Sequence, residues 1–191
     1  MLDDRDVRFD LFALGLLALT IFLGLSLVTY SPADSLGEPI FPLNLVYQPH
    51  QVEYPLNDVI HNACGHAGAT CADVLLRTFG VAAYFVVLCI AFVDVMLLTR
   101  RPIEGAGTRV FGWLLALVGG VTLIQMFLPA INVGPAIGPG GIVGAMGRSF
   151  LESHFATAGS LILLGSLIVG GVMLCTDYVI CLLYTSDAAD E

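Results

Sequence analysis

The chain contains no lysine, and all seven of its basic residues are arginines. A P-loop places a lysine beside the phosphates of a nucleotide, so this absence excludes ATP hydrolysis at a site of that kind. A nucleic-acid-binding face needs basic side chains gathered along the phosphates, which seven scattered arginines do not supply. We therefore expect neither ATP hydrolysis by that route nor direct binding of nucleic acid by this chain.

The chain has few charged residues and several long apolar runs. Only 12% of the residues are charged, 57% are hydrophobic, and the mean hydropathy is +0.88. Four apolar runs cover residues 11–30, 79–99, 110–128 and 155–180. A helix of roughly 20 apolar residues crosses the ~30 Å hydrocarbon layer of a bilayer. We predict an all-α membrane protein with four transmembrane helices, solvated by the lipid bilayer.

The arginines are unevenly distributed between the two sides of these spans. Five lie on one side, and two lie on the other. The five are Arg5, Arg8, Arg100, Arg101 and Arg109, and the two are Arg77 and Arg148. Positive charge is retained in the cytoplasm, so we expect both termini to be cytoplasmic. The long first loop, residues 31–78, and the segment 129–154 would then lie on the outer side of the membrane.

Each outer segment is expected to contain a short helix. Prolines in the first loop block long helices, but residues 57–76 suit a short amphipathic helix ahead of the second span. Residues 132–147 contain six glycines and no basic residue. That composition indicates a turn and a short helix before the fourth span rather than a phosphate-binding loop.

Four side chains of the first outer loop are of the types that bind zinc: His61, Cys64, His66 and Cys71. Their H-x2-C-x-H-x4-C spacing does not match a standard zinc module. An oxidising exterior favours a Cys64–Cys71 disulfide instead, and the four residues equally fit a cluster without special chemistry. A membrane thiol redox protein using Cys64 and Cys71 is a further hypothesis, although the C-x-x-C pair usual in such enzymes is missing.

Asp94 is the one ionisable side chain well inside an apolar run. A carboxylate at membrane depth is a functional candidate by default. Arg100 follows six residues later, about 9 Å along a helix, so we expect Asp94 to pair with Arg100 or Arg101 near the interface. The alternative is a stand-alone four-helix transporter or channel that uses Asp94 and Gln125.

Small residues recur at intervals of four in the last two spans. Gly112, Ala116 and Gly120 do so in the third run, and Ser166 and Gly170 do so in the fourth. Such spacing lets helix backbones approach closely. It predicts helix packing within the bundle, between subunits, or both.

Several motifs follow one another in a fixed order. The first apolar run ends in Y-S-P-A-D at residues 30–34. Residues 62–69 read N-A-C-G-H-A-G-A, with A-D at 72–73 and F-G-V-A-A-Y at 79–84, and residues 140–144 read G-G-I-V-G. In this order they resemble the motifs of the membrane domain of FtsK/SpoIIIE-type DNA translocases.

The resemblance implies the N-terminal four-helix anchor of a septal DNA translocase. Such a domain lies in the bacterial cytoplasmic (inner) membrane and tethers a cytoplasmic hexameric ATPase motor at the division septum for chromosome segregation. The resemblance implies that it is not itself an enzyme, with no catalytic residues and no cofactor. It implies a homo-oligomer, a hexamer by resemblance, and contacts with cell-division proteins. The residues expected to shape the helix ends are Ser31, Pro32, Asp34, Gly65, Gly68 and Asp73. The long first loop, the cysteine and histidine cluster and Asp94 depart from the family pattern.

The end of the chain has a different character. Residues 181–191 read C-L-L-Y-T-S-D-A-A-D-E, which resembles the translation of a transposase-type sequencing-library adapter. We expect an anchor domain at residues 1–180, truncated before a motor, and a non-native tail at 181–191. A short native acidic tail is the alternative.

Overall fold

The computed structural model describes residues 7–36, 55–98, 106–129 and 138–175. Within these ranges the chain forms six helices and no strand. The helices are α1 (Val7–Val28), α2 (Gly65–Phe79), α3 (Ala82–Leu98), α4 (Ala106–Phe127), α5 (Gly141–His154) and α6 (Thr157–Cys175).

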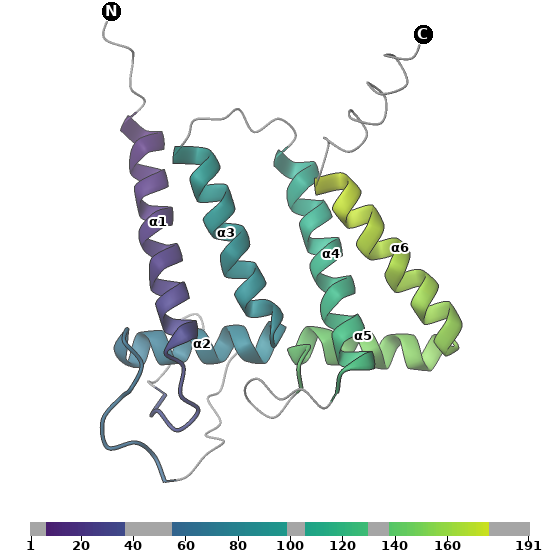
Figure 1. Cartoon of the computed structure of the whole chain (residues 1–191), viewed down its shortest axis with the longest axis horizontal. Coiled ribbons are helices and arrows are strands. Elements are labelled where there is room, and N and C mark those ends of the chain that lie inside the picture. The colour runs from purple at the N-terminus through teal and green to yellow at the C-terminus, as the bar shows by residue number, and fades with distance from the viewer. Residues whose placement is uncertain (1–6, 37–54, 99–105, 130–137, 176–191) are drawn as a thin grey trace, which may run out of the picture.

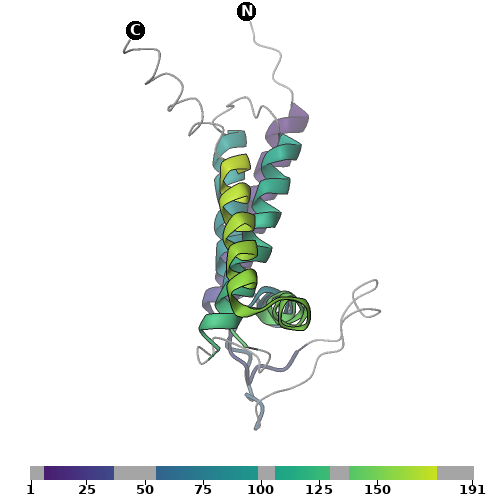
Figure 2. The ribbon, with the colours of Figure 1, turned by 90° about the vertical axis from the view of Figure 1, so that its right-hand side faces the viewer.

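Four long helices stand side by side, and two shorter ones lie across one end of them. Helices α1, α3, α4 and α6 form the upright set, while α2 and α5 are the cross-helices (Figure 1). Figure 2 shows the same arrangement from the side, with α5 seen nearly end-on beneath the upright helices. We call the end with α2 and α5 the cross-helix end. The opposite end, where α1 and α4 begin and α3 and α6 finish, is the terminal end.

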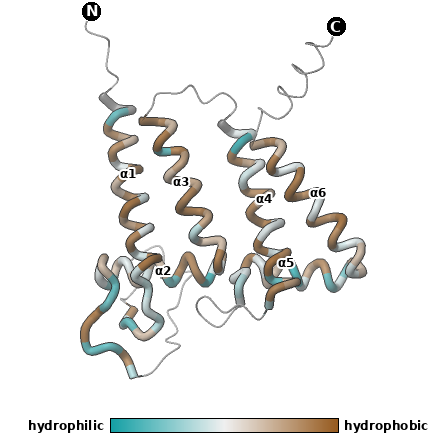
Figure 3. Tube along the Cα trace, in the orientation of Figure 1, coloured by the Kyte–Doolittle hydropathy of each residue, from teal (hydrophilic) through white to brown (hydrophobic). Residues whose placement is uncertain are grey.

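The upright helices have the composition of membrane spans. Residues 10–28, 107–127 and 157–175 are each long and apolar enough to cross a bilayer, and α2 with α3 adds a fourth candidate as a pair bent by 110°. Apolar residues cover nearly the full length of the upright helices, whereas polar residues gather near the cross-helices (Figure 3). These findings confirm an all-α membrane protein.

The spans begin and end at different residues from those that hydropathy predicts. The second apolar run starts at residue 79, but α2 ends at Phe79 and α3 starts only at Ala82. Gly80 separates them with a φ of 58°, a conformation that side-chain-bearing residues rarely adopt. The fourth span begins at Thr157 because Phe155 is extended, and residues 176–180 of the expected span lie outside the described residues.

Both predicted short helices are present. The one expected within residues 57–76 is α2, shifted toward the second span, and the one expected before the fourth span is α5. The molecule therefore has two halves with the same order of elements: α1, α2, α3 and then α4, α5, α6. Within the spans, α1 packs on α3 and α4 packs on α6, while α3 and α4 touch only slightly.

Candidate functional site

The centre of the first half is Asp34, whose side chain is fully buried in the loop after α1. Its carboxylate accepts hydrogen bonds from the side chain of Asn57 at 2.7 Å and from the backbone N–H groups of His61 at 3.1 Å and Asn62 at 2.9 Å. Burial has the largest influence and raises the pKa of Asp34, but these hydrogen bonds together hold that pKa below its ordinary value. Asp34 thus connects the loop segment that precedes α2 to the turn that follows α1.

The turn that presents Asp34 begins at Ser31. The N–H of Asp34 donates to the carbonyl of Ser31 at 3.2 Å, which closes a four-residue turn. Pro32 occupies its second position, where a proline fixes the φ that the turn requires. The side chain of Asn57 also donates to the Ser31 hydroxyl at 3.2 Å, so the turn and the returning loop are joined twice.

Asn62 carries the connection back to α1. Its side-chain N–H donates to the carbonyl of Ser26 at 2.9 Å, and its side-chain oxygen accepts from the N–H of Cys64 at 3.0 Å. The N–H of Ala63 donates to the hydroxyl of Thr29 at 3.0 Å. The last carbonyls of a helix and the N–H groups at the start of the next have no partner inside their helices. Here the side chains of Asn62 and Thr29 supply those partners.

The two glycines of this motif serve different purposes. Gly65 opens α2 with a φ of 65°. Gly68 lies where α2 crosses α1, and a Cβ there would stand 2.3 Å from the side-chain oxygen of Asn62 and 2.9 Å from the Ser26 hydroxyl. No side chain fits at that distance, so the close crossing of α2 over α1 depends on Gly68.

Asp73 ties the middle of α2 to the same region. Its buried carboxylate accepts from the Tyr30 hydroxyl at 3.1 Å and forms an ion pair with Arg77 at 2.6 Å. The hydroxyl of Tyr84, on α3, donates to the carbonyl of Leu27 at 3.3 Å. We call the assembly the polar cluster: Tyr30, Ser31, Asp34, Asn57, Asn62, Gly68, Asp73 and Tyr84.

In the second half, α5 is held against α4 by a side-chain hydrogen bond and by close packing at two glycines. The side chain of Gln125, on α4, accepts from the N–H of Gly140 at 2.8 Å. A Cβ at Gly144 would stand 2.7 Å from the carbonyl of Val121, and one at Gly147 would stand 2.2 Å from the hydroxyl of Thr122. Sequence reasoning assigned Gln125 only to a transport hypothesis, whereas its side chain is engaged in holding the start of α5.

The two cross-helices meet end to end. The N–H of Val81 donates to the carbonyl of Pro139 at 2.9 Å. A Cβ at Gly80 would stand 2.0 Å from that carbonyl oxygen, and one at Gly141 would stand 2.7 Å from the carbonyl of Arg77. This glycine junction was missed from the sequence, because F-G and G-G motifs 60 residues apart give no sign of mutual contact.

Close packing also joins α4 to α6. A Cβ at Gly171 would stand 2.6 Å from the carbonyl of Gly112 and 2.6 Å from the N–H nitrogen of Ala116. The spacing therefore identified Gly112 and Ala116 correctly. Gly120 and Gly170 make no close contact within the chain, since a Cβ there would meet nothing within 4 Å, and their part in packing between subunits stays a prediction.

The cysteine and histidine residues of the first loop are not gathered into a metal site. In the part of the chain that the structure describes, no three His, Cys, Asp or Glu side chains are grouped to hold an ion. Cys64 and Cys71 are free thiols, and His66 contacts the carbonyl of Ser35 at 3.1 Å. Burial, with a smaller effect of Cys64, raises the pKa of Cys71, which disfavours the thiolate that redox chemistry requires.

Asp94 lies buried in α3, with 1% of its surface exposed. Among the described residues none donates a hydrogen bond to its Oδ1 atom. The ion pair expected with Arg100 or Arg101 falls on residues outside those described. A buried polar atom without a hydrogen-bond donor is costly, so the structure gives no stabilising role to Oδ1 among the described residues.

Comparisons with known proteins point to one family. A family profile described as the 4TM region of DNA translocase FtsK/SpoIIIE matches residues 7–185, a range that runs five residues past position 180. A curated relative, the DNA translocase FtsK of Bradyrhizobium diazoefficiens, is 27% identical over 136 residues, which make up 71% of this chain and 14% of the relative. The chain therefore spans a small part of that relative's length. No solved structure matches significantly.

Proposed function

The chain belongs to the FtsK/SpoIIIE family of DNA translocases through its four-transmembrane region, and we propose that it anchors an ATP-driven DNA motor to the membrane. The chain is a multi-pass inner-membrane protein. In the proposal it performs no chemistry, and the motor that it tethers at the division septum for chromosome segregation lies outside residues 1–180.

The observation that carries this proposal is the convergence of the family-like motifs on one polar cluster. Y-S-P-A-D, N-A-C-G-H-A-G-A, A-D and F-G-V-A-A-Y are spread over residues 30–84. Yet Asn62, Asp73 and Tyr84 all form hydrogen bonds with residues 26–34, at the end of α1 and in the turn after it. Their side chains are engaged with backbone and with each other. Residues used in this way support a rigid scaffold rather than a catalytic centre.

The proposed orientation has the terminal end in the cytoplasm. Arg109 lies in the first turn of α4 at this end, whereas Arg77 and Arg148 lie on the cross-helices at the other. With the arginines of residues 1–8 and 100–101, the positive-inside rule favours this assignment. The start of α1 and the end of α6 then face the side on which a motor would work.

Self-association and contacts with division proteins are part of the same proposal. Only 17% of the spanning part of α1 (residues 10–28) and 17% of that of α6 (residues 157–175) are buried within the chain. Most of their apolar surface therefore faces outward. Lipid covers such surface readily, and so do neighbouring subunits. A homo-oligomer, a hexamer by family resemblance, would place copies of this domain around the motor.

A replacement experiment tests the anchor function. Residues 1–180 are joined to the linker and motor of the Bradyrhizobium relative, in cells whose own translocase lacks its membrane region. The proposal predicts restored division, and continued restoration in Asp94→Asn and in the Cys64→Ser, Cys71→Ser double variant. Failure of the unmodified fusion, when it is inserted in the membrane at normal levels, would refute the anchor function. Failure of Asp94→Asn alone would favour the transport hypothesis, and failure of the cysteine variant would favour the redox hypothesis.

A further inference from the structure

The two halves leave an apolar groove between α3 and α4. It has a volume of about 310 Å³ and is lined by side chains of both helices together with Phe79 and Cys175. Phe92, Val110 and Leu114 line it and remain exposed at 57%, 59% and 54%, so the groove opens to the outside of the bundle. In a membrane, its opening faces lipid.

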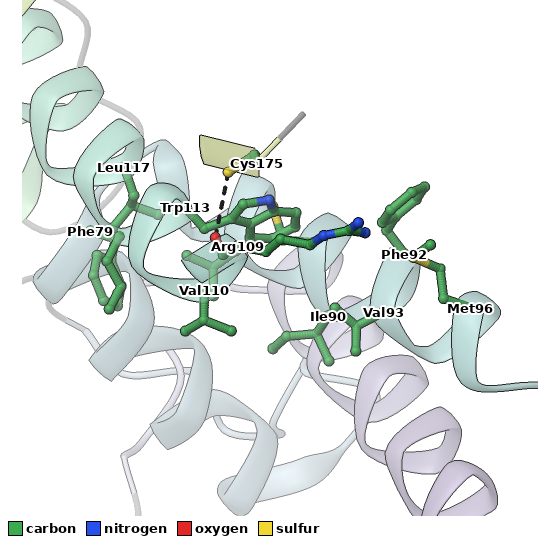
Figure 4. Close-up of a pocket in the computed structure, with 13 residues that line it drawn as sticks. Phe79, Ile90, Phe92, Val93, Met96, Arg109, Val110, Trp113, Leu117 and Cys175 are labelled. Carbon is green, nitrogen blue, oxygen red and sulfur yellow. Dashed lines mark hydrogen bonds between the residues drawn. The ribbon is translucent and has the colours of Figure 1, made fainter. Parts of the chain in front are cut away.

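Among the described residues that line this groove, one carries a charge. Arg109 lies at the terminal end, and its side chain points toward Phe92 and Met96 (Figure 4). Its carbonyl accepts a hydrogen bond from the Cys175 thiol at 3.5 Å, which fixes the start of α4 against the end of α6. Arg109 therefore places a positive charge at one end of an apolar groove, and its guanidinium favours an anion such as phosphate.

The length of the groove matches one leaflet. From Met96 to Val86 along α3 is ten residues, or ~15 Å of helix. Half of the ~30 Å hydrocarbon layer has the same depth. An acyl chain that enters at the terminal end would thus lie along the groove while its headgroup reaches the level of Arg109.

We propose that this groove binds an anionic phospholipid, with its phosphate at Arg109 and an acyl chain between α3 and α4. The lipid fills the space that the slight contact of the two halves leaves open. Basic pockets between transmembrane helices favour anionic headgroups for the same electrostatic reason. In the proposed orientation the lipid comes from the cytoplasmic leaflet, but its binding does not depend on the motor or on the septum.

The chain carries its own probe for this site. Trp113 is the only tryptophan of the sequence, and it lines the groove. Bromine atoms on an acyl chain quench tryptophan fluorescence on contact. The whole chain is placed in phosphatidylcholine vesicles that contain a small fraction of either brominated phosphatidylglycerol or brominated phosphatidylcholine.

We expect brominated phosphatidylglycerol to be preferred about five-fold over brominated phosphatidylcholine, the size expected of one arginine near an anionic lipid. Arg109→Gln should abolish the preference, and Arg109→Lys, which keeps the charge, should retain most of it. Equal quenching by the two lipids in the unmodified chain would overturn the proposal. So would a preference that survives in Arg109→Gln.

A second pair of variants tests the acyl-chain position. Val93→Phe narrows the groove and should reduce quenching by both lipids at least two-fold. Val95→Phe makes the same change two residues away, at an exposed position that does not line the groove, and should leave quenching unchanged. Weak quenching by both lipids in the unmodified chain would contradict lipid occupancy and would indicate that protein, from this chain or a second copy, covers Trp113.

Discussion

The two halves repeat the order of a span, a cross-helix and a second span, yet they fasten the cross-helix differently. In the first half, α2 is connected to α1 through loop side chains, chiefly Asp34 and Asn62. In the second half, α5 lies directly on α4, with Gly144 and Gly147 at the contact. The loops explain the difference, since the first one returns a long polar segment over α1 and offers many side chains for hydrogen bonding.

The same difference extends to the spans. Helices α4 and α6 approach until the backbone of Gly171 touches that of Gly112. Helices α1 and α3 meet through side chains instead, as at Gly24, where a Cβ would be at an ordinary 3.9 Å from Val87. In a bilayer, where no hydrophobic effect drives helices together, close packing and hydrogen bonds are the available stabilising contacts. Both halves use both kinds of contact, at Gly68 and at Gln125, but hydrogen bonds are more numerous in the first half and close glycine contacts in the second.

The largest effect is expected where the halves meet. Gly80→Ala puts a Cβ 2.0 Å from the Pro139 carbonyl at a φ of 58°, so both the contact and the backbone are strained. We expect a loss of about 3 kcal/mol in stability. Unfolding by sodium dodecyl sulfate in mixed micelles, followed by Trp113 fluorescence, measures it. Gly120→Ala, with open space around the position, is the control, and equal losses in both would contradict the junction.

Breaking the glycine contact of the second half should cost somewhat less. Gly171→Ala forces α6 away from α4, because the new methyl group would lie 2.6 Å from two backbone atoms. We expect a loss of about 2 kcal/mol in the same unfolding assay. Gly170→Ala alters the neighbouring residue, which faces open space, and should be nearly neutral. The reverse ranking would show that α4 and α6 pack through a different face.

The stability of the first half should depend on pH through Asp34, whereas the glycine contacts of the second half should not. Because folding lowers the pKa of Asp34, its carboxylate stabilises the fold fully above the ordinary value of 3.8, and this stabilisation is lost as the pH falls through the lowered pKa. Asp34→Asn should therefore cost about 1.5 kcal/mol at neutral pH, and the difference should shrink in acid.

Hydrogen exchange at the amides of His61 and Asn62, which bond to Asp34, reads out this effect. Asp58→Asn removes the same charge from an exposed position of the same loop and is the matched control. A difference between Asp34→Asn and the unmodified chain that stays constant into acid would contradict the assigned role of the carboxylate.

The smallest effect is expected at Asp94. Its Oδ1 has no hydrogen-bond partner among the described residues, so Asp94→Asn removes no observed contact of that atom. We expect a change within about 0.5 kcal/mol, because the substitution keeps the size of the side chain and breaks no observed hydrogen bond of Oδ1. The detergent unfolding assay measures it. A large loss would mean that Asp94 has a partner in the assembled protein, and would reopen the transport hypothesis.

Sequence reasoning found what hydropathy and short motifs encode. Spans, cross-helices and the motif residues Asp34, Gly68 and Asp73 are local signals, because a turn, a helix end or a missing side chain leaves a mark within a few residues. The structure then shows each of them against another motif residue: Asp34 and Gly68 lie against Asn62, and Asp73 accepts a hydrogen bond from Tyr30. That they support a membrane anchor at the septum remains a proposal.

Contacts between segments that are far apart in the sequence could not be predicted from local patterns. Nothing in the sequence joins Gly80 to Pro139, or Gln125 to Gly140, until the cross-helices are placed. Small-residue spacing likewise fits several helix faces, so it did not single out Gly171, which makes the contact between α4 and α6 within the chain. The groove at Arg109 arises only because α3 and α4, neighbours in the chain, pack on other partners.

One measurement tests the anchor account most directly: the position of green fluorescent protein fused after residue 180, imaged in dividing cells. This reporter fluoresces when it stays in the cytoplasm and not when it is exported unfolded. The account predicts a fluorescent band at the septum, weakened in Gly80→Ala and unchanged in Gly120→Ala. A membrane-inserted fusion that is dark, or one that fluoresces evenly around the cell, would contradict it.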